Sequence, residues 1–251
     1  MQVVGLVCSN TKETKKYLLP LSDIHWGAKT CNVEKLRGYI RWALEHNAWV
    51  ILNGDLIENA NRSSVGAGVY EQDKQPQQQA DEIIDVLTPL TKKKQIIGLL
   101  TGNHEERTFK DTGFDISYYI ARQLNVPYMR YSGLFKLKVC DINYVVFATH
   151  GSSGSRFLRT KMQACEALSN VAHADIYLYG HVHDLITWST TYYYVDIKNK
   201  QKKQDRRTFA ITGTFQEYDG TYADAKNLIP GKTGAVRIRL SGDHKDVHSS
   251  I

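Results

Sequence analysis

The chain has 251 residues, of which 42% are hydrophobic, and its formal net charge is +6. This length and composition can build a sizeable core, which excludes a disordered protein, and no apolar run approaches the ~20 residues of a membrane-spanning helix. The basic balance, with a pI of about 9.0, mildly favours anionic partners such as phosphates or nucleic acid. Four widely spaced cysteines predict reduced thiols and a cytoplasmic location.

Short apolar runs rich in β-branched or aromatic residues alternate with helical patterns along the first part of the chain. The predicted strands cover 17–21, 49–53, 95–100, 144–149 and 175–179, and the predicted helices cover 33–44, 80–90, 116–124 and 156–169. This alternation predicts an α/β sheet. Three further predicted strands, at 185–196, 207–214 and 234–240, have no helices between them. They would add antiparallel strands to that sheet or form a second one.

Each of the five strands of the first part ends in side chains that bind metals. These segments are Asp23-Ile24-His25, Gly54-Asp55, Gly102-Asn103-His104-Glu105, His150-Gly151 and Gly180-His181-Val182-His183. Taken singly, the first three are also common turn or helix-cap sequences, whereas His181-Val182-His183 on a strand would place both imidazoles on one face. Ligand sites of open α/β sheets lie beyond the carboxyl ends of the strands, so the five segments together predict one metal centre. Seven oxygen and nitrogen ligands exceed the needs of one tetrahedral zinc and suit two ions that share a carboxylate.

The order of these five segments resembles the calcineurin-like metallophosphoesterase superfamily, and the likeness covers residues 23–183. The resemblance implies an α/β fold, a four-layer α-β-β-α sandwich of two mixed sheets flanked by helices, as a single domain over 1–251. It implies two divalent metal ions, most often manganese, with iron, zinc, nickel or magnesium as alternatives. The implied ligands are Asp23, His25, Asp55 and His183 for the first ion, and Asp55, Asn103, His150 and His181 for the second.

The resemblance also implies that His104 is not a ligand but stabilises the substrate phosphate and protonates the leaving oxygen, with Glu105 orienting or charge-tuning it. Two divalent ions can lower the pKa of a shared water, and the resulting hydroxide attacks phosphorus in line. An adjacent imidazole then supplies the leaving-group proton. The sequence therefore predicts a binuclear phosphoesterase acting on phosphate esters.

The substrate is predicted from smaller similarities. Residues 56–59 lack the Asp-Arg-Gly continuation of protein phosphatases, whereas Asp23 to Gly27 is similar to the Asp-x-His-x-Gly opening of double-strand-break repair nucleases. Overall the chain looks most like small stand-alone phosphoesterases of bacteria and phages. Phosphodiester or nucleic-acid substrates are therefore favoured. The alternatives are a phosphomonoesterase acting on small nucleotides or phosphoproteins, and a scaffold of the same fold without activity.

Three regions are candidates for substrate recognition. Arg107 must stay close to His104 and is expected to bind phosphate. The segment 59–79 has no clear periodicity, and its Arg62 and Tyr70 could hold phosphate or stack on a base; a solvated loop is the alternative. Residues 198–207 contain six cations and one acid. This stretch is interpreted as a solvated, charged hairpin tip in preference to a nucleic-acid arm.

Overall fold

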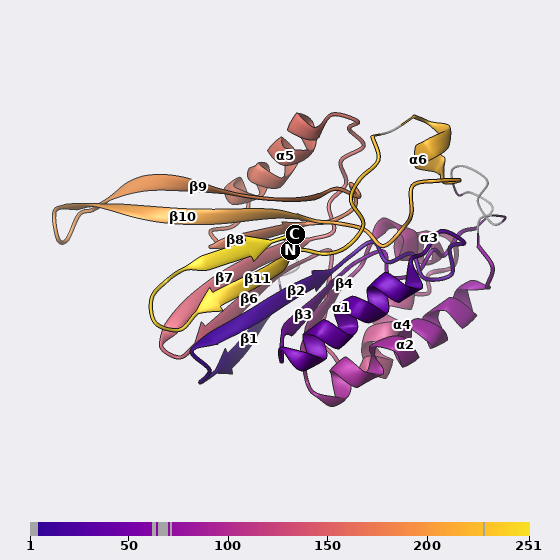
Figure 1. Ribbon diagram of the computed structural model, residues 1–251, viewed down its shortest axis with the longest axis horizontal. Helices are drawn as coiled ribbons and strands as arrows, with labels where there is room; N and C mark the ends of the chain where they lie inside the picture. The colour runs from indigo at the N-terminus through magenta and orange to yellow at the C-terminus, as the bar shows by residue number, and fades with distance from the viewer. Residues whose placement is uncertain (1–4, 62–63, 65–69, 71, 228) are drawn as a thin grey trace.

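Two sheets of six strands pack face to face, and helices cover their outer faces (Figure 1). This arrangement comes from a computed structural model that describes residues 5–61, 64, 70, 72–227 and 229–251. The α/β class and the two mixed sheets flanked by helices are therefore confirmed.

The first sheet has the strand order β12-β11-β2-β3-β4-β5. Its strands are β2 (Lys15–Leu21), β3 (Trp49–Asn53), β4 (Ile96–Leu100), β5 (Tyr128–Arg130), β11 (Arg237–Ser241) and β12 (Val247–Ser250). Strands β2 to β5 are parallel, and β11 joins β2 antiparallel. Parallel strands need crossover connections, which the helices supply.

Helices α1 (Val33–Glu45), α2 (Pro76–Lys92) and α4 (Ile116–Leu124) supply the apolar residues that pack on the outer face of this sheet. Each begins with a recognisable signal. Asn32 accepts the backbone N–H of Lys35, and Asp115 accepts that of Tyr118, which satisfies donors of the first helical turn. Pro76 lies at the first position of α2, where its missing N–H costs nothing.

The second sheet has the strand order β1-β6-β7-β8-β10-β9. Its strands are β1 (Gly5–Thr11), β6 (Ser132–Val139), β7 (Ile142–Thr149), β8 (Ile176–Tyr179), β9 (Leu185–Asp196) and β10 (Gln201–Thr212). Helix α5 (Leu158–Glu166), continued by the 3₁₀ turn η2 (Ala167–Asn170), packs on its outer face. Apolar side chains from both sheets fill the space between them, among them Leu18, Ile51, Phe135 and Ile176.

Several features differ from the expectation. Helix α3 (Asn103–Thr112) begins inside the segment Gly102–Glu105, where no helix was predicted. Strand β10 begins at Gln201 and not at residue 207, so most of the basic stretch 198–207 is strand. The strands after residue 183 are also divided between the two sheets. A short helix, α6 (Tyr222–Ala225), follows β10. Within the described ranges, no helix is both long and apolar enough to cross a membrane.

Candidate metal centre

The seven predicted ligands meet where the carboxyl ends of strands from both sheets approach each other. Asp23, Asp55 and Asn103 follow β2, β3 and β4 of the first sheet, whereas His150 and His181 follow β7 and β8 of the second. A single sheet edge, as the strand pattern alone suggested, therefore carries only part of the set. The site lies across the junction of the two sheets.

Five of these seven residues have left-handed backbone conformations. The φ angles are 50° for Asp23, 52° for His25, 49° for Asp55, 71° for His181 and 55° for His183. Such conformations cost about 1–3 kcal/mol each and persist where surrounding structure enforces them, most often at functional sites. The chain thus turns sharply after β2, β3 and β8, and these turns carry five of the ligand side chains into a common space.

One cluster consists of Asp23, His25 and His183, whose ligand atoms lie within 4.8 Å of one another. The Nε2 atoms of His25 and His183 are 3.1 Å apart, and His183 Nε2 is 3.3 Å from Asp23 Oδ1. The outer nitrogen of His25, Nδ1, lies 2.9 Å from Glu58 Oε2. This outer carboxylate fixes the ring so that Nε2 points to the cluster centre.

A second cluster consists of Asp55, His150 and His181, again within 4.8 Å, and Asn103 joins it. His150 Nε2 lies 3.1 Å from both Asp55 Oδ2 and Asn103 Oδ1. His181 Nδ1 lies 2.6 Å from the same Asn103 oxygen. The outer nitrogen of His150 is held 2.8 Å from the Asn53 carbonyl. Asp55 also groups with His25 and His104, so it lies between the two clusters.

The residues present fit divalent ions in both positions. The side chains of Asp23 and Asp55 are buried, where an ionised carboxylate is costly unless a cation compensates it. Burial opposes the charged form of His150, but Asp55 and Asp23 outweigh it and raise its pKa to about 10. Imidazole and carboxylate atoms therefore converge on one space that requires positive charge. Mixed nitrogen and oxygen donors suit transition metals such as manganese or zinc.

His104 lies beside these clusters, and its two ring nitrogens have different neighbours. Nδ1 donates to the Glu58 carbonyl at 2.7 Å, since a carbonyl only accepts. Nε2 faces the Arg107 guanidinium at 2.9 Å and lies 3.9 Å from Asp55 Oδ2. Burial lowers the pKa of His104 to about 4, with the Asp55 carboxylate opposing the shift. Arg107 is thus placed at His104, as expected from the sequence.

The predicted partner of His104, Glu105, lies elsewhere. Its carboxylate accepts the backbone N–H groups of Gly102, Asp55, Leu56 and Ile57 at 2.6–3.2 Å. Successive helical residues point about 100° apart, so a side chain directed back to the helix start cannot also face the ring of its neighbour. Glu105 therefore holds the loop that presents Asp55, and the expectation that it orients the His104 ring is corrected.

Glu58 is the residue that the sequence interpretation missed. It contacts His25 through Oε2 at 2.9 Å, and its Oε1 lies 3.5 Å from His104 Nδ1. The neighbouring Asn59 donates to the His104 carbonyl and accepts from Thr108. An acid three residues beyond Asp55, in the segment that follows a candidate ligand, was the signal available in the sequence.

Two glycines permit the close approach of these loops. A Cβ on Gly102 would collide with the carboxylate and backbone N of Asp55. A Cβ on Gly54, whose φ is +84°, would lie 2.7 Å from both the Gly102 backbone N and His150 Nδ1. Larger residues at either position would displace the proposed bridging carboxylate.

A cleft of about 440 Å³ opens over the centre. Its lining includes His104 and Arg107 of α3, Lys161 of α5, and Gln216 and Tyr218 of the segment after β10. Among the other expected recognition residues, Tyr70 has 80% of its surface exposed. Arg62 lies outside the described residues.

The comparisons with known proteins agree with this geometry at the level of the family. A family model of calcineurin-like phosphoesterases matches residues 18–185, more than half of the chain, and the chain therefore belongs to this family. No curated protein matches it in sequence.

Two solved structures are among those that match this chain. A predicted phosphoesterase from Streptococcus pneumoniae has 16% identity and a TM-score of 0.39, with 94% of this chain and 98% of that chain covered. A double mutant of Vps29 from Entamoeba histolytica has 13% identity and a TM-score of 0.43, with 93% and 98% covered.

Proposed function

We propose that this chain is a binuclear metal-dependent phosphoesterase that prefers phosphodiesters, including nucleic acids. The observation that carries the proposal is the pair of ligand clusters on either side of Asp55, next to His104 and Arg107. The four cysteines are free thiols, which supports the proposed cytoplasmic location.

The first ion would be held by Asp23, His25, Asp55 and His183, and the second by Asp55, Asn103, His150 and His181, with manganese the favoured metal. When bound, such a pair of ions lowers the pKa of water and offsets the negative charge of the phosphate. Among the residues that the structure describes, Asp55 is the one carboxylate that belongs to two of the ligand groups, which is why it is proposed as the bridge.

The protein's own contribution to the chemistry is the placement of His104 and Arg107. Because Nδ1 of His104 donates to the Glu58 carbonyl, Nε2 is the ring nitrogen that would pass a proton to the leaving oxygen. With the pKa of His104 lowered to about 4, Nε2 would gain that proton when the negative charge of a bound phosphate raises the pKa. The Arg107 guanidinium contacts this same nitrogen and can donate hydrogen bonds to phosphate oxygens when a substrate binds. Glu58 fixes both His25 and His104 and is proposed as a positioning residue.

The preference for diesters is supported by the room around the centre. The cleft of about 440 Å³ lies within the range of sites that take organic molecules and is much larger than a phosphate group. The segments that contribute Lys161 and Tyr218 line it beyond the candidate ligands. An ester group can therefore be accommodated on each side of the scissile phosphorus.

The test compares hydrolysis of bis-p-nitrophenyl phosphate and p-nitrophenyl phosphate by the manganese-loaded protein. We expect faster diester turnover, and His104→Ala should lower it by about 10²–10⁴-fold while two manganese ions per chain are retained. His173→Ala is the matched control, because this histidine lies outside the centre with its side chain 74% exposed. Faster monoester turnover would favour the phosphatase alternative, and loss of manganese from His104→Ala would contradict the assigned role.

A further inference from the structure

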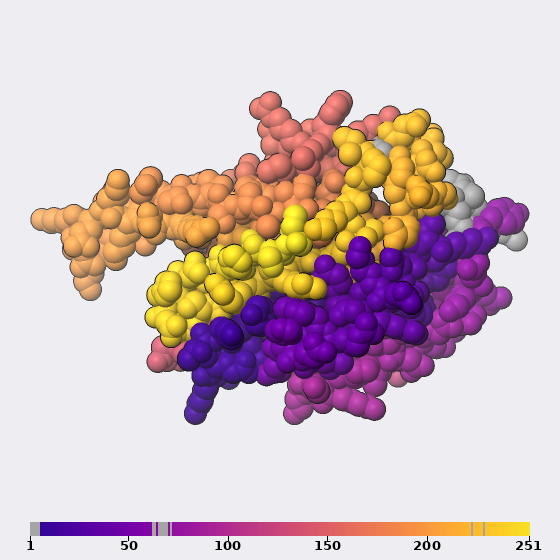
Figure 2. Space-filling view, viewed as in Figure 1, coloured from indigo at the N-terminus to yellow at the C-terminus, as the bar shows by residue number. Residues whose placement is uncertain are grey.

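The hairpin of β9 and β10 extends well beyond the sheet that it joins. Strand β8 pairs with β10 only at Thr208–Ile211, whereas β9 and β10 stay paired out to Asp196 and Gln201. Residues 190–207, here called the arm, therefore form a two-stranded ribbon that projects from the body of the molecule (Figures 1 and 2). A ribbon without further strands is only marginally stable in water.

The strand register gives the arm two chemically different faces. One face, the paired face, consists of Thr190, Tyr192, Tyr194, Asp196, Gln201, Lys203, Asp205 and Arg207. On it, Lys203 contacts Asp196 at 2.5 Å and Arg207 contacts Asp205 at 3.1 Å. Both acids of the arm lie on this face and neutralise its cations.

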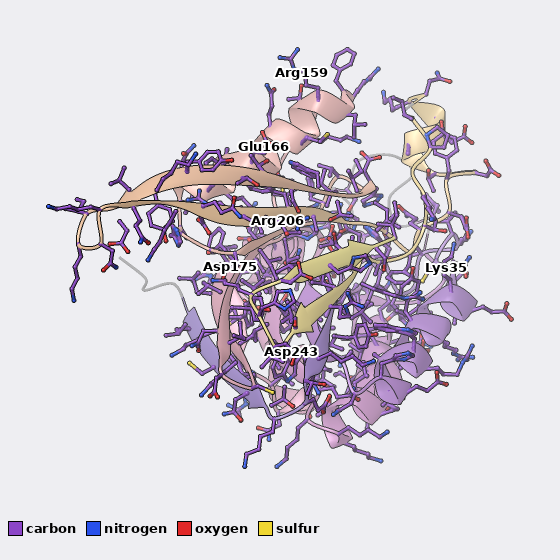
Figure 3. All side chains as sticks on the ribbon, turned by 60° about the vertical axis from the view of Figure 1, so that its left-hand side comes forward. Lys35, Arg159, Glu166, Asp175, Arg206 and Asp243 are labelled. Atoms are coloured by element: carbon purple, nitrogen blue, oxygen red, sulfur yellow. The ribbon has the colours of Figure 1, made fainter. Side chains whose placement is uncertain are left out.

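The other face, the open face, consists of Thr191, Tyr193, Val195, Lys202, Gln204 and Arg206. It contains two cations and no acid. Lys202 lies 4.3 Å over the ring of Tyr193, and 65% of that tyrosine is exposed. The Arg206 side chain is 60% exposed and 3.9 Å from Asp246, and Figure 3 labels it on β10. Lys198 and Lys200 add two cations in the turn.

The charge of the arm identifies the kind of partner. Residues 190–207 contain six Lys or Arg and two Asp, so the arm has a formal net charge of +4. The whole chain has 32 Lys and Arg against 26 Asp and Glu, so the rest of the chain has only 26 against 24. The rest of a second copy of this chain is therefore close to neutral overall, whereas a polyanion complements the charge of the arm.

We propose that the open face of the arm binds a nucleic-acid strand. Lys202, Arg206 and the cations of the turn would neutralise phosphates, and the exposed ring of Tyr193 would stack on a base. A two-stranded ribbon is also narrow enough to follow a nucleic-acid groove.

The arm points away from the metal centre. Strand β9 begins at Leu185, two residues after His183, and its 12 residues extend over about 40 Å. The open face would therefore hold a strand far from its scissile phosphate. This inference rests on the proposed function only in so far as the bound strand is also the substrate.

The test uses two double variants of the full chain that remove equal charge from opposite faces, Lys202→Gln with Arg206→Gln and Lys203→Gln with Arg207→Gln. Binding of a labelled single-stranded DNA of about 20 nucleotides is followed by fluorescence anisotropy in EDTA, which prevents turnover, at several salt concentrations. The open-face variant should bind about tenfold more weakly, with a salt slope smaller by about 1 to 2, and the paired-face variant should bind much as the parent does. Tyr193→Ala should weaken binding without changing the slope.

Equal losses in both variants, or no loss in either, would overturn the assignment to the open face. A parent protein that is dimeric in solution and becomes monomeric on Tyr193→Ser would instead identify the arm as an interface between copies of this chain. Hydrolysis of bis-p-nitrophenyl phosphate should be unchanged in both double variants. Because this readout is independent of DNA binding, failure of the proposed function and failure of the arm can be told apart.

Discussion

Replacing Glu105 tests how the centre is held together. Its carboxylate accepts four backbone N–H groups, from Gly102, Asp55, Leu56 and Ile57, and it is buried. Glu105→Ala removes all four acceptor positions, and each buried donor left unpaired costs about 1–3 kcal/mol. We expect the free energy of unfolding to fall by about 4 kcal/mol, the lower end of the sum for four donors, because water can enter the space left by the side chain. This is a large part of the ~5–15 kcal/mol that stabilises a typical domain.

Two further variants sharpen the measurement. In Glu105→Gln the amide oxygen keeps two of the backbone N–H donors. The amide NH₂ cannot accept from the other two, so the free energy of unfolding should fall by about 2 kcal/mol. In Glu106→Gln the altered side chain accepts a hydrogen bond from the Tyr131 hydroxyl, which the amide oxygen can still accept, and the free energy of unfolding should change by no more than ~0.5 kcal/mol. Urea unfolding of the manganese-loaded variants gives all three values. A Glu105→Ala protein as stable as Glu106→Gln would refute the role of Glu105 as the support of the Asp55 loop.

Three other predictions concern the centre itself. Asp55→Asn should lower the affinity for both manganese ions by more than about tenfold, whereas Asp23→Asn should lower the affinity for one. Equilibrium dialysis with manganese measures both affinities. Equal effects of the two substitutions would contradict a bridge at Asp55. Gly102→Ala should cost about 2 kcal/mol or more, because its Cβ collides with Asp55. Gly154→Ala, with nothing within 4 Å, should be neutral in the same urea assay. Removing the metal with EDTA should lower the thermal midpoint, since an ion at 100 times its Kd contributes about 2.7 kcal/mol; an unchanged midpoint would count against ion binding.

The sequence predicts best the elements whose burial is uniform or strictly periodic. Strand β3 was predicted over its observed range because all five of its residues are buried and apolar runs of this length are typical of central parallel strands. Helix α4 was predicted equally well, because Ile116, Ile120 and Leu124 repeat at helical spacing.

Helix α3 was not predicted, and its composition explains why. Its buried residue is Glu105, a charged side chain, so no apolar stripe marks it. The signal was instead the reach of Glu105 back to the Gly102 N–H, a contact at the start of a helix. Interpreting Gly102–Glu105 only as a source of ligands and catalytic groups overlooks that Glu105 also stabilises the start of α3.

The composition of the candidate site was easier to predict than its geometry. The strand ends marked all seven candidate ligands, but nothing in the periodicity shows that Asp23 and His181 come from different sheets. That Glu58 serves both His25 and His104 depends on the path of one loop. Such contacts depend on tertiary packing, which local patterns do not specify.

Anomalous scattering from crystals grown with manganese tests the central claim most directly. We expect two peaks about 3.5–4 Å apart, both in contact with Asp55, one beside His25 and His183 and the other beside His150 and His181. A single peak, or peaks away from Asp55, would contradict the binuclear centre.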